Sequence, residues 1–198
     1  FADSGFRVFE SIVDDGGHIL AIRVPDAGDT GRAAMDRLEE HVTEEIGAAG
    51  LIYFQFPSDG SDMEQNLSTD AMPKEYGRAA ADQIGAGTGD LMLVLAGQAP
   101  TVYHQAGQLR LHLGEKLNLR PAPGEGPDRF VWITDFPLVE YDEDAGRYVS
   151  MHHPFTAPKP EHLDKLETHP EEVEARAYDL VLNGNEIGGG SIRIHNRE

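Results

Sequence analysis

The chain has 198 residues, of which 39% are hydrophobic, so it can form one sizeable folded domain or two small ones. No apolar run approaches the roughly 20 residues that a membrane-spanning helix needs, and the absence of cysteine excludes disulfides and thiolate metal sites. Sixteen Lys and Arg against 35 Asp and Glu give a formal charge of −19, which argues against nucleic-acid binding by this chain alone.

The first hundred residues alternate between strand-like and helix-like segments. Short apolar runs bounded by Gly, Pro or Asp predict strands at His18–Val24, Leu51–Phe56 and Asp90–Gly97. Apolar residues at helical spacing predict helices at Thr30–Ala48, Lys74–Ile84 and Pro100–Leu119. This order of elements predicts a compact α+β module.

The segment RPAPGEGPD, Arg120–Asp128, carries three prolines and two glycines and is the strongest linker signal in the chain. We place a domain boundary there and expect one domain over residues 1–120 and another over residues 121–198. In the second domain, Asn183-Gly184 predicts a hairpin turn within YDLVLNGNEIGGGSIRIH. A short helix is expected across Glu171–Ala177. Antiparallel strands should otherwise dominate this domain, so the whole chain is expected to be α+β.

Two acidic side chains flank the predicted turn. If the strands pair through Asn183-Gly184, Val181 lies opposite Glu186 and Asp179 lies opposite Gly188, which places both carboxylates on one face. Two acids on one face repel each other unless a cation lies between them, so a site for a hard divalent ion such as Mg²⁺ is one interpretation. A solvated acidic face is the other interpretation.

Arg193 lies between two isoleucines, in a run whose other members are apolar or small. A guanidinium buried there needs a carboxylate or phosphate partner, which is either a structural ion pair or a ligand. The preceding run Gly188–Gly190 has no side chains, so a ligand could lie directly against the backbone; a flexible loop is the alternative. The adjacent His152 and His153 would face opposite ways on a strand, so they cannot chelate one ion together.

Two stretches, FPLVEYDEDAGRYVSMHHPFTAPKP and AYDLVLNGNEIGGGSIRIH, closely resemble the catalytic domain of bacterial-type aspartyl-tRNA synthetases. The segments FRVFESIVDDGGHILAIRVP and GDLMLVLAG resemble the GAD domain that bacterial members carry as an insertion. That domain also occurs in a subunit of a tRNA-dependent amidotransferase. The resemblance covers nearly the whole chain and implies a GAD-like insertion domain followed by part of a class II antiparallel catalytic domain.

For the parent enzyme, the resemblance implies the activation of L-aspartate with ATP and Mg²⁺, and transfer of the aspartyl group to the 3′ end of tRNA(Asp). The parent is expected to be a cytoplasmic homodimer without membrane association. The chain itself resembles an internal fragment, which is expected to be inactive and not dimeric because other class II motifs and the anticodon-binding domain are missing from it. The competing interpretation is a non-catalytic GAD-type accessory module that contacts tRNA, as in the amidotransferase.

The resemblance also implies roles for individual residues. The residues expected to bind the aspartate substrate are His152, Gly189, Ser191 and Arg193. Among them, Arg193 holds the side-chain carboxylate of the substrate and His152 supports it. The residues expected to serve ATP and its metal ion are Asp179 and Glu186, with Glu186 contacting both. No catalytic residue is assigned within this chain.

The spacing of two of these residues predicts an irregular strand. Glu186 and Arg193 are seven residues apart, and in a regular strand an odd separation places two side chains on opposite faces. The resemblance requires both on one face. We therefore expect a β-bulge or a break in pairing within Gly188–Gly190, with at least one of these glycines at positive φ and with Ile187 and Ile192 packed into the core.

Overall fold

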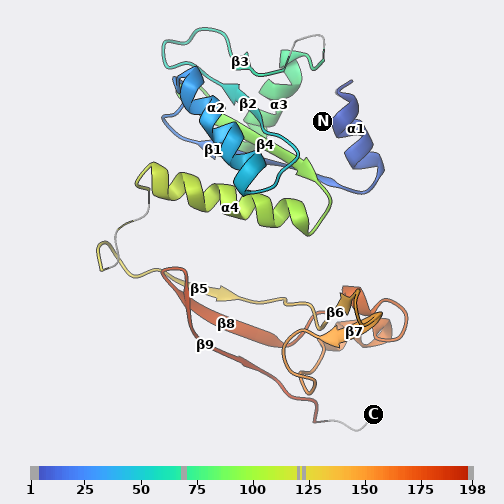
Figure 1. Ribbon diagram of the computed structural model, residues 1–198. Helices are drawn as coiled ribbons and strands as arrows, with labels where there is room; N and C mark the ends of the chain where they lie inside the picture. The colour runs from blue at the N-terminus through green and yellow to red at the C-terminus, as the bar shows by residue number, and fades with distance from the viewer. Residues whose placement is uncertain (1–4, 68–70, 120, 122–123, 196–198) are drawn as a thin grey trace. The chain divides into compact units, whose positions relative to one another are not determined.

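The computed structural model describes residues 5–67, 71–119, 121 and 124–195. The chain divides into two compact units, Phe1–Pro121 and Ala122–Glu198 (Figure 1). Residues 120, 122 and 123 of the predicted linker lie outside the described residues. None of the described helices has the length and apolar character needed to cross a membrane.

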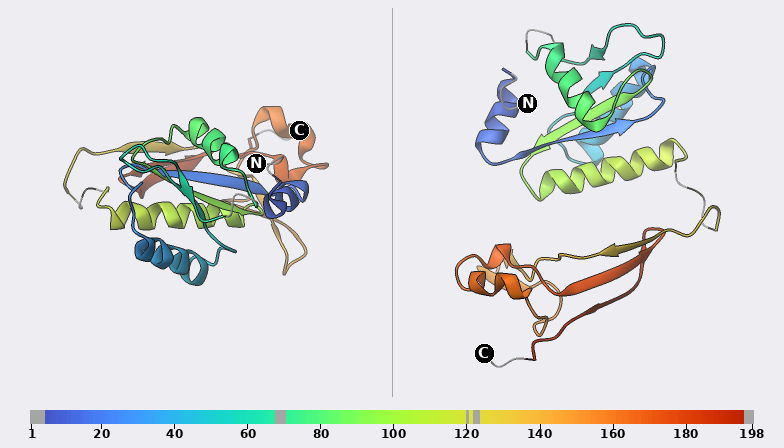
Figure 2. Two further views of the ribbon diagram at one scale, coloured as in Figure 1. Left: turned by 90° about the horizontal axis from the view of Figure 1, so that it is seen from above. Right: turned by 180° about the vertical axis from the view of Figure 1, so that it is seen from behind.

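The first unit is a four-stranded antiparallel sheet with helices on both faces (Figures 1 and 2). Its strands are β1 (His18–Val24), β2 (Ile52–Gln55), β3 (Glu64–Gln65) and β4 (Leu91–Gly97), in the spatial order β1-β4-β2-β3. Its helices are α1 (Arg7–Asp14), α2 (Arg32–Glu40), α3 (Lys74–Ile84) and α4 (Thr101–Lys116), and α2 continues into a π-helical turn η1 (His41–Glu45). The strands and helices predicted for this part of the chain are confirmed.

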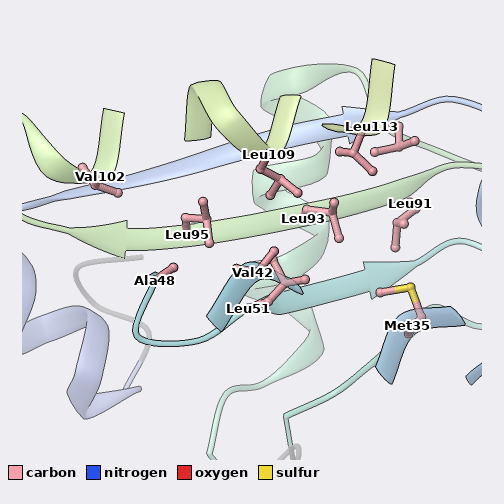
Figure 3. Packing of buried hydrophobic residues seen from close by; sticks show 11 residues of the cluster. Met35, Val42, Ala48, Leu51, Leu91, Leu93, Leu95, Val102, Leu109 and Leu113 are labelled. Atoms are coloured by element: carbon pink, nitrogen blue, oxygen red, sulfur yellow. The ribbon is translucent and has the colours of Figure 1, made fainter. Parts of the chain in front are cut away.

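The central strand β4 builds one core on each face of its sheet. Leu91, Leu93 and Leu95 belong to a cluster with side chains from α2, η1 and α4, which Figure 3 shows from close by. Met92 and Val94 belong to the opposite cluster, with side chains from α1 and α3. All five are at most 2% exposed, so the alternation of a strand fills both faces.

Local signals determine the ends of the helices that cover this sheet. Gly85 has a φ of +66°, the left-handed conformation that terminates α3. Asn118, with a φ of +51°, stands just after α4, where asparagine tolerates that conformation better than most residues. Pro100 directly precedes α4, at an end where a missing backbone N–H breaks no helical hydrogen bond.

The second unit contains a three-stranded antiparallel sheet and a separate hairpin. The sheet has the order β5-β8-β9 and consists of β5 (Phe130–Ile133), β8 (Ala177–Leu182) and β9 (Asn185–Ser191). The hairpin pairs β6 (Val139–Asp142) with β7 (Arg147–Ser150). Two short 3-10 helices, η2 (Pro160–Lys165) and η3 (Pro170–Glu172), separate β7 from β8 along the chain. The α+β class predicted for the whole chain is confirmed.

The helix predicted across Glu171–Ala177 is wrong. Only the 3-10 turn η3 forms there, and the chain then runs extended beside residues 136–138. The Leu138 N–H donates to the Val173 carbonyl at 2.8 Å, and the Ala175 N–H donates to the Phe136 carbonyl at 2.7 Å. This pairing satisfies the backbone groups and buries Val173 and Ala175, which outweighs the helix propensity of the segment.

Asp90 holds the turn before β4 in place. Its carboxylate is buried, and it accepts hydrogen bonds from Arg23 Nε at 2.8 Å and from the Gly87 N–H at 2.9 Å. Burial alone would raise the pKa of Asp90. The hydrogen bonds from Gly87 and Arg23, together with the charge of Arg23, outweigh burial and hold the pKa below its usual value.

We predict that Asp90→Asn lowers the free energy of unfolding by about 1–3 kcal/mol, because an amide cannot accept the charge-assisted bond from Arg23. A depressed folded-state pKa contributes stability above the unfolded value of about 3.9, and this contribution is lost as the pH falls through the folded value. Urea unfolding measures the loss of stability caused by Asp90→Asn, which should be larger near neutral pH than at about pH 3. Asp82→Asn, at an exposed site, is the control, and equal losses in both variants would contradict the prediction.

Candidate active site

The hairpin of β8 and β9 carries most of the residues predicted for the site. Asn183 and Gly184 have φ values of +50° and +87°, as the central residues of a type I′ turn require. This turn places Val181 opposite Glu186, so the pairing predicted next to the turn is confirmed. The Asn183 side chain also accepts a hydrogen bond from the Arg129 N–H at 2.9 Å, which ties the turn to the residue before β5.

The register shifts one step further from the turn. Leu180 pairs with Gly188, and Asp179 pairs with Gly189. The predicted pairing of Asp179 with Gly188 is therefore wrong. Ile187 is the extra residue of a β-bulge, which opposes no residue of its own on β8.

The bulge brings five of the predicted residues to register positions on one face of the sheet. Paired residues share a face, and so do alternate residues of one strand. Asp179 therefore shares its face with Glu186 before the bulge, and with Gly189, Ser191 and Arg193 after it. The predicted break of alternation between Glu186 and Arg193 is confirmed.

The position and geometry of the break differ from the prediction. The extra residue lies just before the glycine run, and none of the three described glycines Gly188–Gly190 has a positive φ. A bulge shifts the register by adding a residue, which does not require a left-handed glycine. Ile187 and Ile192, predicted to lie in the core, are 52% and 40% exposed.

Two of the three glycines leave room for side chains of β8. A Cβ on Gly189 would lie 2.2 Å from the Asp179 Oδ1 atom and 3.1 Å from the Tyr178 carbonyl oxygen. A Cβ on Gly190 would lie 2.8 Å from the Tyr178 hydroxyl oxygen. A Cβ on Gly188 would meet nothing within 4 Å. The Asp179 carboxylate thus lies directly over the backbone of Gly189.

Thr156 joins the site although the sequence analysis did not single it out. It pairs with Arg193 in an antiparallel bridge, and it is only 3% exposed. Its hydroxyl oxygen accepts from Arg193 Nη1 at 3.4 Å, and the hydroxyl donates to Ser191 Oγ at 3.4 Å. The sequence offers one signal for Thr156: it is the last residue of the HHPFT motif and carries a hydroxyl between the apolar Phe155 and Ala157.

Arg193 itself is exposed, so the prediction of a buried guanidinium is wrong. Within the described ranges it forms no ion pair, which leaves its charge available to a ligand. The His152 ring packs edge-on against Phe136 with centroids 4.6 Å apart, and no described contact joins it to Arg193. His153 accepts the Phe155 N–H on Nδ1 at 3.1 Å, which orders the loop locally.

An ion-pair network includes Asp135, the residue before the Phe136 ring on which His152 packs. Lys159 donates to both Asp135 and Glu174 and thereby connects two segments distant in sequence. The hydrogen bonds to Asp135 and Glu174 raise the pKa of Lys159 above its ordinary value, and the bond from Lys159 lowers the pKa of Asp135. Phe136, on which His152 packs, directly follows Asp135. The ion pairs therefore tether the residue next to the ring that His152 contacts.

The two predicted metal carboxylates differ in their surroundings. Asp179 is half-buried and Glu186 is exposed, and neither forms an ion pair with another described residue. The described ranges contain no group of three or more His, Cys, Asp or Glu able to hold a metal ion. Within the described residues, the two carboxylates would leave the other ligands of a cation to come from elsewhere.

We predict that Gly189→Ala lowers the free energy of unfolding by about 1–3 kcal/mol, because the new Cβ must displace the Asp179 carboxylate. Gly188→Ala is the matched control, since its Cβ meets nothing nearby and alanine in a strand gains up to about 1 kcal/mol over glycine. Urea unfolding of the two variants measures the difference. If both variants were as stable as the unmodified chain, Gly189 would not be needed to seat Asp179.

Comparison with known proteins assigns the chain to a family. Residues 34–198 match the tRNA synthetases of class II (D, K and N). The chain is 75% identical over 198 residues to the aspartate–tRNA(Asp/Asn) ligase of Salinibacter ruber, and 43% identical over 198 residues to the aspartate–tRNA ligase of Oceanobacillus iheyensis. It covers all of its own length in both matches but only 32% of each relative. The chain belongs to the class II tRNA synthetase family that comprises the D, K and N enzymes.

Proposed function

We propose that this chain is part of an aspartate–tRNA ligase, which activates L-aspartate with ATP and transfers the aspartyl group to the 3′ end of tRNA(Asp). The observation that carries the proposal is the shared face of β8 and β9, with a cation toward one end and two carboxylates toward the other. The names of the relatives, which match residues of both units, support a ligase over an accessory module. In this proposal the parent enzyme is a homodimer of the cytoplasm.

Arg193 is the proposed binding group for the side-chain carboxylate of aspartate. Its guanidinium is exposed and not ion-paired among the described residues, and Thr156 holds it at one nitrogen. The planar fork of a guanidinium matches a carboxylate with two parallel hydrogen bonds. Ser191 and Gly189 precede Arg193 on the same face, where they would contact the rest of the amino acid. His152 is proposed to support Arg193.

Asp179 and Glu186 are the proposed groups for ATP and its Mg²⁺. Mg²⁺ in nucleotide sites usually keeps several waters and takes one or two protein carboxylates together with phosphate oxygens. Two carboxylates on one face, without a third protein ligand among the described residues, fit that requirement. A bound Mg²⁺ would neutralise the charge of the phosphates, and the carboxylates of this chain would hold and orient it.

The division of the chain assigns different roles to its two parts. Residues 121–198 are proposed to contribute to the catalytic domain, and residues 1–120 to form a GAD-like insertion domain. The proposed substrate residues all lie in the second part, between His152 and Arg193. The first part, with its two hydrophobic clusters, would then be a module that folds around its own core.

A chimeric ligase tests the proposed function. In it, this chain replaces the matching 198 residues of the Salinibacter ruber relative, to which it is 75% identical. The chimera is expected to charge tRNA with aspartate in the presence of ATP and Mg²⁺. A folded chimera without this activity, beside an active unmodified relative, would contradict the proposal.

In the same chimera, Arg193→Lys is expected to lower kcat/KM for aspartate at least about 100-fold, roughly 3 kcal/mol, because an ammonium cannot reproduce the bidentate fork. Arg147→Lys, at an exposed position of β7, is the matched control and should leave the kinetics unchanged. Aspartylation rates over a series of aspartate concentrations measure both variants. A near-normal KM for aspartate in Arg193→Lys would remove Arg193 from the substrate site.

Thr156→Val is expected to raise the KM for aspartate about tenfold, because it removes the hydroxyl that holds Arg193 while keeping the shape of the side chain. The kcat should change less, since Thr156 does not contact the substrate in this proposal. Thr156→Ser keeps the hydroxyl and should restore the KM. A loss of stability without a change in KM would show that Thr156 has a structural role only.

A further inference from the structure

The first unit contains a cavity between α2 and α4 that the proposed ligase site does not use. Its volume is about 480 Å³, which is in the range of small-molecule binding pockets. The accessible apolar side chains of its lining include Ala34 and Leu38 of α2 and Leu117 just after α4, whereas the buried Met35, Leu91 and Leu113 contribute little surface. Figure 3 shows Met35, Leu91 and Leu113 at the same end of the hydrophobic cluster.

The ionisable side chains that line the cavity are all basic. They are Arg37, His41, His112 and Lys116, and no acidic side chain of the described residues lines the cavity. The lining thus has one Arg, one Lys and no described acid, whereas the whole chain has 35 Asp and Glu against 16 Lys and Arg. Such a lining complements an anion.

Two of these bases are stacked on each other. The rings of His41 and His112 lie 3.8 Å apart between centroids with an interplanar angle of 23°. Burial, followed by the neighbouring His41 and Lys116, lowers the pKa of His112, and Glu115 opposes this shift only in part. The stacked rings offer a flat apolar surface, while protonation of His112 adds positive charge to the cavity.

A structural explanation accounts for part of this arrangement. Lys116 lies in the last turn of α4, where a cation interacts favourably with the helix dipole, and Arg37 lies in the last α-helical turn before η1. That explanation requires neither a cavity nor the stacked histidines beside it. It also predicts that the two side chains matter for stability only, whereas a ligand site predicts an effect on binding.

We propose that this cavity binds a small organic anion with an apolar body. The apolar body lies against Ala34, Leu38 and Leu117, and the anionic head group lies at Arg37 and Lys116. The chemical class is an aliphatic or aromatic carboxylate with more carbon than the aspartate of the proposed ligase reaction. This inference concerns the first unit alone and does not depend on the proposed function.

Octanoate is the probe for this site in the 198-residue chain. A titration followed by the ring signals of His41 and His112 in a carbon-proton NMR correlation spectrum should give saturable shifts, with a Kd of about 1 mM or tighter. Octan-1-ol, which lacks the charge, and acetate, which lacks the apolar body, should each bind at least about tenfold more weakly. Equal binding of octanol, or no saturable shift with octanoate, would overturn the proposal.

Matched variants separate the cavity bases from general electrostatics. Arg37→Gln combined with Lys116→Gln should weaken octanoate binding at least about tenfold. Arg32→Gln combined with Arg110→Gln removes the same charge from the same two helices outside the cavity and should leave binding unchanged. Equal weakening by both pairs, or by neither, would overturn the proposal, and circular dichroism confirms that each variant is folded.

The pH dependence gives a second readout. A bound anion favours the imidazolium form of His112, so octanoate affinity should rise as the pH falls through the pKa of that histidine. The other charged groups that act on His112 are His41, Lys116 and Glu115. His112→Phe keeps an aromatic ring against His41 and should abolish most of this pH dependence. An affinity that does not change between about pH 7 and about pH 5.5, the range around a histidine pKa below its ordinary value, would contradict a head group close to His112.

Discussion

A single extra residue in β9 determines which side chains share a face of the hairpin. In an uninterrupted ladder from the Val181–Glu186 pair, Asp179 would lie beside Gly188, and Arg193 would point away from Glu186. Ile187 shifts the register by one and reverses this parity for every later residue of the strand. The bulge thus brings the carboxylates and the guanidinium to one surface, which the proposed chemistry of aspartate and ATP requires.

The sequence predicted the turn of this hairpin better than the pairing beyond it. The Asn183-Gly184 dipeptide predicted the turn and the first pair beyond it, because type I′ turns strongly favour that dipeptide. The spacing of Glu186 and Arg193 predicted that the alternation must break. The position of the break could not be read from Gly188–Gly190, because residues without side chains carry no pattern of inward and outward faces. A left-handed glycine was expected because glycine permits it, but permission is not a requirement.

The two units show why some elements were predictable and others were not. In β4, Leu91–Leu95 are an apolar run bounded by polar residues and glycine, and burial on both faces follows directly. The segment Glu171–Ala177 was expected to be a helix, yet residues 173–175 pair as extended chain. This pairing was not predicted because the partners lie more than 30 residues away in sequence. Thr156 was missed for the same reason, since its contact with Arg193 spans 37 residues. Contacts between distant segments leave little trace in local periodicity.

The charge of −19 limits how an anion can approach this chain, but it does not exclude local anion sites. At physiological ionic strength, exposed charges more than about 8 Å apart are largely screened. The affinity of an anionic group therefore depends mainly on the cations that it touches, such as Arg193 on the hairpin or Arg37 and Lys116 in the cavity. An exposed guanidinium stays hydrated and needs no structural acid, so keeping it without an ion pair costs little stability. This chain carries a large excess of acid. A cation without an acidic neighbour therefore indicates an anion-binding site more strongly here than it would on a basic surface.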